Sequence, residues 1–492
     1  MRRCLPFLVS ALLAGRLALA APPGAAVPDY HGDPAHSGHA VIAGLTWAKA
    51  AATARDNGFD GSVKGHVNAQ PLYWRPSGAA RGTVIVATDA DMVYALDAST
   101  GQPVWQRSLG SAATRSQVDC GNINPLGVTG TPVIDPAHGA LYLSAMVAQD
   151  GSARHLVFGL SLADGAVLPG WPVDVAEALR AKGLEFSPRV QEQRGALALL
   201  DGRVYVPYSG YYGDCGPYRG WVVGFDLMHP GIAAAWDTRG TKGGIWAPGG
   251  IVSDGTSLLF ATGNTAGART WGDGEAIFRL SPDLQRTTDP DRFFTPSNWR
   301  DLDDEDADLG GTAPTLLDMP RGAPAHLVLA LGKDGAAYLL DREHMGGIGR
   351  ALATVPVSDT AIRTATARYP APDGVLVAFQ GHGLSCPGND GLMALKITAD
   401  PAPKVSRAWC APLDGRGAPI VTTRDASAEP VVWVVGAEGD DRLHAFRGDT
   451  GAPLYTSERL PGLRHFATVL AADGRLYVAG DDRVYAFNVG AQ

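Results

Sequence analysis

The sequence is poor in charge and has no basic run. Asp, Glu, Lys and Arg make up 18% of the 492 residues, and the formal net charge is −9. A surface that binds nucleic acid needs clustered Lys and Arg to neutralise phosphates, and no stretch of this chain supplies such a cluster. We therefore expect no nucleic-acid partner.

Cysteine is scarce as well, with five in the chain. No CxxC pair suggests structural zinc, and no CxxCH motif suggests a covalently attached haem. Cys4 lies in the N-terminal apolar stretch, so four cysteines are left for disulfides. The sequence leaves the pairing open; we favour Cys386–Cys410, which fall within one repeat of the pattern described below, and thus Cys120–Cys215.

Long hydrophobic runs are missing beyond the N-terminus. The run MRRCLPFLVSALLAGRLALA (residues 1–20) is interrupted at Arg16, whereas a membrane-spanning helix needs about 20 uninterrupted apolar residues. Arginines, an apolar stretch and small residues near Ala20 are typical of a secretory signal peptide. We predict a signal peptide over residues 1–20, no membrane span after its cleavage, one domain over residues 21–492, and a periplasmic or secreted location.

Helical periodicity is also missing, and short β-rich runs between Gly, Asp and Asn take its place. The chain has 62 Gly and 35 Pro. The segment GTVIVATDADMVYALDASTGQPVW (residues 82–105) has the alternation and turns of a four-stranded antiparallel meander. Its third-strand signature returns eight times, as VYALDASTG (93–101), VFGLSLADG (157–165), VVGFDLMHPG (222–231), AIFRLSPD (276–283), AYLLDREHMGG (337–347), LMALKITAD (392–400), LHAFRGDTG (443–451) and VYAFNVG (484–490).

This spacing predicts an all-β fold, an eight-bladed β-propeller of four-stranded antiparallel blades. The last copy stops after its third strand, near Asn488. The segment GLTWAKA (residues 44–50) resembles the missing outer strand, with Trp47 in the expected place, so we predict that an N-terminal strand closes the last blade and removes the open sheet edge.

The loops that lead into the innermost strands of a propeller face one mouth of its central channel. We predict that the polar and aromatic residues of these loops surround one pocket; they are His66, Trp246, Asp308, Arg363, Arg416, Arg464 and His465.

The repeat resembles the pyrroloquinoline quinone (PQQ) repeat, whose consensus is close to VYALDASTGQPVW. The resemblance covers essentially the whole mature chain and implies the propeller. Because assembly lipoproteins and other non-catalytic scaffolds share the repeat, a binding or assembly scaffold is one of the functions that it implies.

Blades four and five carry a more specific resemblance, to quinoprotein alcohol dehydrogenases. The order GG-x-W, Asp, L-x-F-x-TGN and GD occurs in residues 243–275, DADLGG follows from residue 306, and LGKDGAAYLLDREHMGG spans residues 331–347. This family holds PQQ on a divalent metal at the propeller centre. The resemblance implies a PQQ-dependent dehydrogenase of an alcohol or sugar hydroxyl, which passes electrons to a separate acceptor because the chain has no haem motif.

The resemblance also assigns the cofactor-binding residues. Trp246 matches the indole under the quinone, where a flat face suits a flat ring. Lys333 matches the cation that contacts the quinone oxygens. Arg363 and Arg464, from the predicted pocket, are expected to bind the cofactor with them.

Metal and catalytic roles are carried over in the same way. Asn264 matches an oxygen ligand of calcium, and Asp214 is the available carboxylate where the family has a glutamate ligand. Asp273 matches the general base that takes the substrate hydroxyl proton. Glu275, two residues later, stands where lanthanide-dependent members have an extra carboxylate, so calcium and a lanthanide are both expected ions. The family's adjacent cysteines and a Pro-Trp element are missing here.

Overall fold

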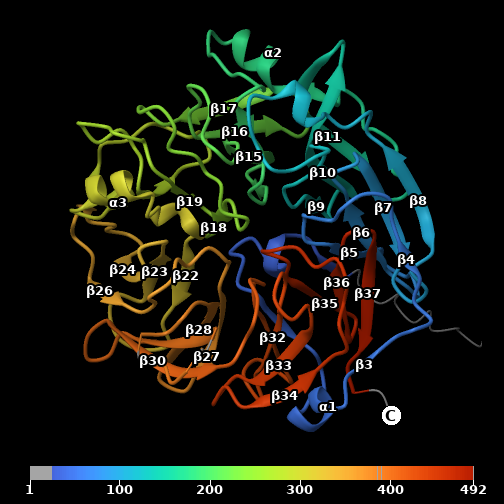
Figure 1. Ribbon diagram of the computed structural model, residues 1–492, viewed down its shortest axis with the longest axis vertical. Helices are drawn as coiled ribbons and strands as arrows, with labels where there is room; N and C mark the ends of the chain where they lie inside the picture. The colour runs from blue at the N-terminus through green and yellow to red at the C-terminus, as the bar shows by residue number, and fades with distance from the viewer. Residues whose placement is uncertain (1–24, 385, 389–390, 491–492) are drawn as a thin grey trace, which may run out of the picture.

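The computed structural model describes residues 25–384, 386–388 and 391–490, so the predicted signal peptide lies outside the described residues. Eight antiparallel sheets follow one another around a central axis (Figure 1), which confirms the predicted eight-bladed propeller. Within these ranges no helix has the length and apolar character needed to cross a membrane.

The first four blades each take their core strands from one stretch of chain. Blade 1 contains β5 (Leu72–Arg75), β6 (Thr83–Ala87), β7 (Met92–Asp97) and β8 (Pro103–Ser108). Blade 2 contains β9 (Val133–Asp135), β10 (Ala140–Gln149), β11 (Ser152–Ser161) and β12 (Val173–Asp174). Blade 3 contains β13 (Gln191–Glu192), β14 (Ala198–Leu200), β15 (Arg203–Gly210), β16 (Trp221–Asp226) and β17 (Ile232–Asp237). Blade 4 contains β18 (Val252–Ser253), β19 (Leu258–Thr262), β20 (Ala276–Leu280), β21 (Phe293–Thr295) and β25 (Gly347–Ile348).

The other four blades complete the ring. Blade 5 contains β22 (Thr315–Asp318), β23 (His326–Leu331), β24 (Ala336–Asp341) and β26 (Ala353–Pro356). Blade 6 contains β27 (Ala367–Ala371), β28 (Gly374–Gln380), β29 (Leu392–Thr398) and β30 (Lys404–Ala411). Blade 7 contains β31 (Ile420–Thr423), β32 (Val431–Val435), β33 (Leu443–Arg447) and β34 (Pro453–Thr456), and blade 8 contains β35 (Val469–Ala472), β36 (Arg475–Ala479) and β37 (Arg483–Asn488).

Short helices lie between the strands. The α-helices are α1 (Trp47–Ala51), α2 (Val175–Arg180) and α3 (Trp299–Glu305), and the 3-10 helices are η1 (Tyr30–Gly32), η2 (Arg115–Gln117), η3 (Pro290–Arg292) and η4 (Leu309–Gly311). Four strands from the N-terminal part extend blades 1, 7 and 8; they are β1 (Ala25–Val27), β2 (His39–Val41), β3 (Ala54–Arg55) and β4 (Gly61–Ser62).

The repeated Trp and Gly hold neighbouring blades together. The indole of Trp105 in blade 1 donates to the Leu162 carbonyl of blade 2 at 2.9 Å. A Cβ on Gly165, whose φ is +69°, would come within 2.6 Å of the same indole. In blade 6, Trp409 has the same relation to Gly451 of blade 7, where φ is +73° and a Cβ would come within 2.7 Å. Glycine is therefore required in this turn both for its backbone conformation and for close approach.

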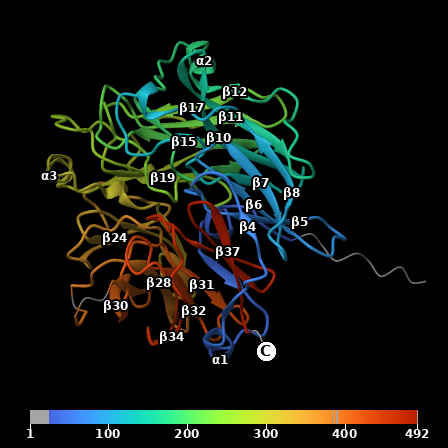
Figure 2. The ribbon, with the colours of Figure 1, turned by 45° about the vertical axis from the view of Figure 1, so that its right-hand side comes forward.

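The ring closes with an N-terminal strand, but the predicted segment was wrong. Strands β3 and β4 both pair with β37, the last strand of the chain (Figure 2). The segment predicted to close the ring instead forms α1, because Thr46 caps the helix by accepting from Lys49 N at 3.2 Å and the Ala-rich sequence that follows favours a helix. The Trp47 indole donates to the Pro430 carbonyl at 3.0 Å and so packs on blade 7.

Residues 28–41 fill one end of the central channel, in blue near the middle of Figure 1. Tyr30 is 2% exposed and packs against Ala196, Ala365 and Ala418. Carbonyls of this segment accept hydrogen bonds from the innermost strands of blades 2, 4, 6 and 7; the donors are Ile134, Ser253, Arg368 and Val421. The segment therefore ties blades together that do not adjoin one another.

His31 makes further links of this kind. Its backbone N donates to Gln70 of blade 1 at 2.9 Å. Its ring nitrogens lie 3.1 Å from the Thr366 carbonyl of blade 6 and 3.1 Å from the Thr468 hydroxyl of blade 8. Burial lowers the pKa of His31 to about 3, so the ring is neutral at ordinary pH.

Asp29 gives a test of this arrangement. The residue is 3% exposed and its Oδ1 has no hydrogen-bond partner. Burial, with the nearby charge of Asp33, raises its pKa to about 7. A folded-state pKa above the unfolded value means that the native state binds a proton more tightly, so stability falls as the pH rises from about 4 through about 7. We expect Asp29→Asn to remove this loss: its melting temperature should exceed that of the wild type by several degrees at pH 8, and by much less at pH 4.5. An equal difference at both pH values would contradict the prediction.

Candidate functional site

A large polar cavity lies around the propeller axis, and residues 28–41 contribute no side chain to it. Its volume is about 1190 Å³. Of the residues singled out from the sequence, eight line it: Asp214, Trp246, Asn264, Asp308, Lys333, Arg363, Arg416 and His465. The cavity thus brings together five of the eight residues to which the resemblance assigns a role.

Trp246 presents its ring to an ammonium group. The Nζ of Lys333 lies 5.2 Å from the centroid of the indole, a cation–π distance. Gly263 passes close by, and a Cβ at that position would come within 2.9 Å of Asp308 Oδ1 and 3.1 Å of Trp246 Nε1. Glycine in the TGN sequence therefore lets the indole and the carboxylate lie side by side.

Lys333 is held between two carboxylates. Its Nζ lies 2.5 Å from Asp308 Oδ2 and 2.8 Å from Asp306 Oδ1. The Lys333 side chain is 12% exposed, that of Asp308 is 5% exposed and that of Asp306 is 70% exposed. Burial opposes the charge on Lys333, but the two carboxylates outweigh it and raise its pKa. Burial raises the pKa of Asp308, and Lys333 offsets part of that rise.

Asp308 is positioned from both sides of its carboxylate. Oδ1 accepts a hydrogen bond from the backbone N of Asn264 at 2.8 Å, while Oδ2 faces Lys333. The Asn264 side chain donates from Nδ2 to Asp306 at 3.1 Å. The loop after β19 and the residues before η4 therefore form one connected polar group, in which Asp308 is the buried carboxylate of the cavity.

Asp214 lies on another part of the cavity wall, beside a disulfide. Its Oδ1 accepts a hydrogen bond from the Tyr218 hydroxyl at 2.5 Å. The neighbouring Cys215 is bonded to Cys120, and the second disulfide joins Cys386 to Cys410, which confirms the favoured pairing. The first disulfide anchors the loop that bears Asp214.

The structure does not bring Asp273 to the cavity. Its side chain is 4% exposed and forms a two-pronged ion pair with Arg239, at 2.5 Å and 2.9 Å, and a second ion pair with Arg286 at 3.0 Å. Its backbone has a φ of +76°. With both carboxylate oxygens bound to guanidinium groups, Asp273 is a structural anchor of its loop in this geometry.

Glu275 and Arg464 also lie outside the cavity lining. Glu275 is fully buried; its Oε2 accepts from Leu309 N at 2.6 Å, and Oε1 has no partner. Burial, and then the charge of Asp308, raise the pKa of Glu275 well above 4.5. Arg464 instead pairs with Asp481, to which His66 is also bound at 3.1 Å.

The carboxylates at this site are already bound by other side chains. In the described part of the chain, no three His, Cys, Asp or Glu side chains come together as a metal-binding group. Calcium takes about six to eight oxygen ligands. The carboxylates of Asp306 and Asp308 are bound to Lys333, and that of Asp214 to Tyr218.

Glu192, Arg194 and Glu438 are among the cavity residues to which the sequence assigned no role. Glu192 and Arg194 stand in and beside the short strand β13, and Glu438 lies in a turn of blade 7. Isolated charged residues of this kind are most often solvated, so no sequence signal distinguishes them.

Comparisons with known proteins agree with the fold. A family model described as outer membrane protein assembly factor BamB matches residues 44–155. No curated protein sequence matches the chain. A quinohemoprotein alcohol dehydrogenase of Pseudomonas putida HK5 is 14% identical, with a TM-score of 0.68 over 95% of this chain and 80% of that chain.

Two further solved structures give similar values. The quinohemoprotein alcohol dehydrogenase of Comamonas testosteroni is 15% identical, with a TM-score of 0.62 over 95% of this chain and 81% of that one. A europium-containing methanol dehydrogenase is 14% identical, with a TM-score of 0.63 over 94% of this chain and 98% of that one. The repeat and the eight-bladed propeller of the quinoproteins are thus present here, and at these identities the likeness concerns the fold alone.

The ion pairs of Asp273 predict the effect of removing its charge. We expect Asp273→Asn to lower the free energy of unfolding by about 2 kcal/mol, because two partly exposed guanidinium groups lose their carboxylate. Asn tolerates the positive φ, so the backbone should stay in place. Chemical denaturation measures the change, and an Asp273→Asn protein as stable as the wild type would contradict it.

Proposed function

We propose that the protein is an exported PQQ-dependent dehydrogenase that oxidises the hydroxyl of an alcohol or sugar and passes the electrons to a separate acceptor. The observation that supports this most directly is the group formed by Trp246, Lys333 and Asp308 inside the axial cavity. The two disulfides are in keeping with export to an oxidising compartment.

The cavity fits a flat quinone that carries carboxylates. Its volume exceeds the range of about 300–1,000 Å³ that is usual for ligand pockets. The indole of Trp246 offers a flat face, and Lys333 offers a positive charge above it. Arg363 and Arg416 are exposed in the cavity wall and form no ion pair within the described residues, so their guanidinium groups suit the carboxylates of such a ligand.

Asp308 is the residue that the geometry favours as general base. When bound, the quinone would accept a hydride from the substrate carbon. Asp308 Oδ2 would take the hydroxyl proton, and burial makes this carboxylate more basic than an exposed one. Lys333 would stabilise negative charge that develops on oxygen beside it. Asp306, from the solvent side, holds Lys333 in place. The general-base role expected for Asp273 therefore passes to Asp308 in this proposal.

No metal takes part in the proposed steps. Asn264 and Asp214 were the expected ligands, yet their neighbours do not supply a complete set of oxygen donors. The protein side chains alone do not complete a shell for calcium or a lanthanide, and Glu275 does not line the cavity. Lys333 supplies the positive charge that this proposal requires.

A non-catalytic scaffold is the alternative, supported by the family model that matches residues 44–155. In that case the cavity would bind no quinone, and partners would dock on the mouths or blade edges of the propeller.

Quinone binding separates the two functions. The purified protein is titrated with PQQ, in chelator and with added Ca²⁺, while the quinone absorbance and the melting temperature are followed. We expect saturable binding in both conditions, and Trp246→Ala should weaken it about tenfold because the stacking face is lost. Trp271→Phe, outside the cavity, is the matched control. If neither readout changes on addition of PQQ, the dehydrogenase proposal must be abandoned.

The base assignment is tested by activity. We expect Asp308→Asn to lower dye-coupled oxidation by about 100-fold or more while PQQ affinity stays within a few-fold, because only proton removal is lost. Asp306→Asn, which removes the exposed partner of the same lysine, should cost less than about tenfold. Equal activity of Asp308→Asn and wild type would remove Asp308 from the mechanism.

A further inference from the structure

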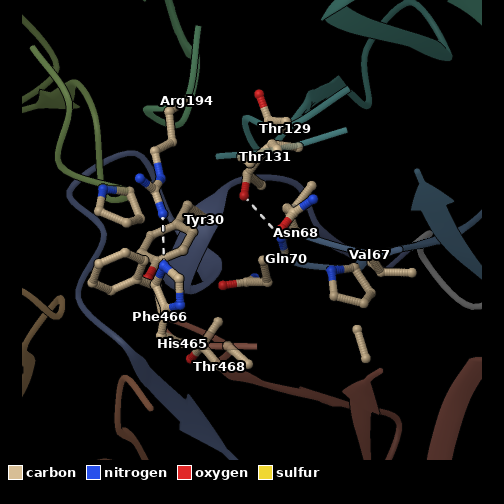
Figure 3. A pocket seen from close by; sticks show the side chains of 16 residues that line it. Tyr30, Val67, Asn68, Gln70, Thr129, Thr131, Arg194, His465, Phe466 and Thr468 are labelled. Carbon is tan, nitrogen blue, oxygen red and sulfur yellow. Dashed lines mark hydrogen bonds between the residues drawn. The ribbon is translucent and has the colours of Figure 1, made fainter. Parts of the chain in front are cut away.

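A second polar group lies in the same cavity, on blades 3, 7 and 8, whereas the residues proposed to bind the quinone come from blades 4 to 7. Arg194 of blade 3 donates from Nη2 to His465 Nε2 of blade 8 at 3.1 Å (Figure 3). His465 Nδ1 lies 2.6 Å from Glu438 Oε1 of blade 7. Arg194 and His465 line both the large cavity and a small one beside Tyr30, and Glu438 lines the large cavity.

The hydrogen-bond partners of His465 determine which of its ring nitrogens carries a hydrogen. A guanidinium only donates, so Nε2 of His465 is the acceptor and Nδ1 carries the hydrogen that Glu438 accepts. Burial lowers the pKa of His465. His465 is therefore neutral and fixes Arg194 in orientation, helped by the Phe466 ring, whose centroid lies 4.7 Å from the guanidinium carbon.

Arg194 is held in place by His465, but this hydrogen bond uses only one of its N–H donors. A guanidinium has about five N–H donors, and the bond to His465 is its one side-chain hydrogen bond within the described residues. The remaining donors lie at the walls of the two cavities that Arg194 lines. The side chain is thus positioned to donate to a ligand.

Glu192 supplies the complementary acceptor. The residue is 8% exposed and lines the large cavity. Its carboxylate makes no hydrogen bond or ion pair to any residue that the structure describes, although buried carboxylates nearly always have a partner. Burial raises its pKa to about 6, and Arg194 offsets part of the rise. An unpartnered buried carboxylate two residues from an unsaturated guanidinium indicates a ligand that binds both.

Phe466 shows backbone strain at the same place. Its φ is +70°, a conformation that bulky residues rarely adopt. The backbone N of Phe466 donates to the Arg416 carbonyl at 2.9 Å, which holds the loop in this conformation. Strain of this kind is concentrated at binding sites, where it orients side chains.

We propose that Glu192, Arg194 and Glu438 form a subsite for a polyhydroxylated ligand, which is a sugar or a linear polyol. We also propose that this ligand is the substrate, which rests on the proposed function. A hydroxyl both donates and accepts, so vicinal hydroxyls pair with a carboxylate and a guanidinium at once. A simple anion is repelled by Glu192 and Glu438. An aliphatic alcohol leaves the buried charges unpaired, which is unfavourable.

The test measures binding to the protein without quinone. Sorbitol, D-glucose and 1-butanol are titrated separately and followed by saturation-transfer NMR and calorimetry. We expect saturable binding of sorbitol or glucose and none of 1-butanol. Glu192→Gln should weaken polyol binding about tenfold, because a charged hydrogen-bond acceptor is lost. Its melting temperature should equal or exceed that of the wild type, which shows that the variant is folded.

Asp414→Asn is the matched control, since Asp414 is an exposed carboxylate of the same cavity wall outside the proposed subsite. Its polyol affinity should be unchanged. Absence of saturable polyol binding, or equal affinity in Glu192→Gln and wild type, would overturn the subsite. Quinone binding without polyol binding contradicts this inference alone. Polyol binding without quinone binding contradicts the dehydrogenase proposal, and with it the role of the polyol as substrate, but leaves the subsite in place.

Discussion

The packing of residues 28–41 into one end of the channel is the constraint on which the site depends. Eight sheets around an axis leave a channel between their innermost strands, and backbone groups that line it must find partners. Tyr30 fills the axis, and the carbonyls of this segment accept hydrogen bonds from four blades. The polar loops at the other end therefore surround a cavity with a closed floor, where charged side chains are shielded enough to interact strongly.

Charge pairing explains why two aspartates of neighbouring blades differ in character. Asp273 is bound by two arginines, which leave neither oxygen for a ligand. Asp308 shares one lysine with Asp306 and faces the cavity beside Trp246. Glu275 lies near Asp308, and burial, followed by the charge of Asp308, raises the pKa of Glu275. The ion pairs thus decide which carboxylate can act as a base, because two arginines occupy Asp273 whereas Asp308 shares only Lys333.

The sequence predicted the fold well because the propeller is a sum of local patterns. Strand alternation, the turn glycine and, in several blades, an outer-strand Trp are all encoded within one repeat. The closing strand was misplaced because local helix propensity after Thr46 outweighed a weak likeness to the outer-strand pattern. The residues that line the cavity were predicted in part, because the position of a loop within the repeat indicates which mouth of the central channel that loop faces. Partners distant in sequence were out of reach: Arg239 lies 34 positions from Asp273, and His465 lies 271 positions from Arg194.

The kind of energetically unfavourable side chain differs between the two ends of the channel, and this difference distinguishes a ligand-binding site from a closed end. The contacts that hold the blades together lie in the strands and in the Trp–Gly turns, and they need no buried charge. The loops around the cavity hold a lysine between carboxylates, an unpartnered Glu192 and a strained Phe466. The Tyr30 end has costly features of another kind, the unpartnered polar atoms of Asp29, Tyr30 and His36. The two ends differ in that the lysine and carboxylates border open space, whereas Tyr30 and its alanine neighbours pack against one another at the other end. The proposed polar ligands would account for the charged side chains at this end.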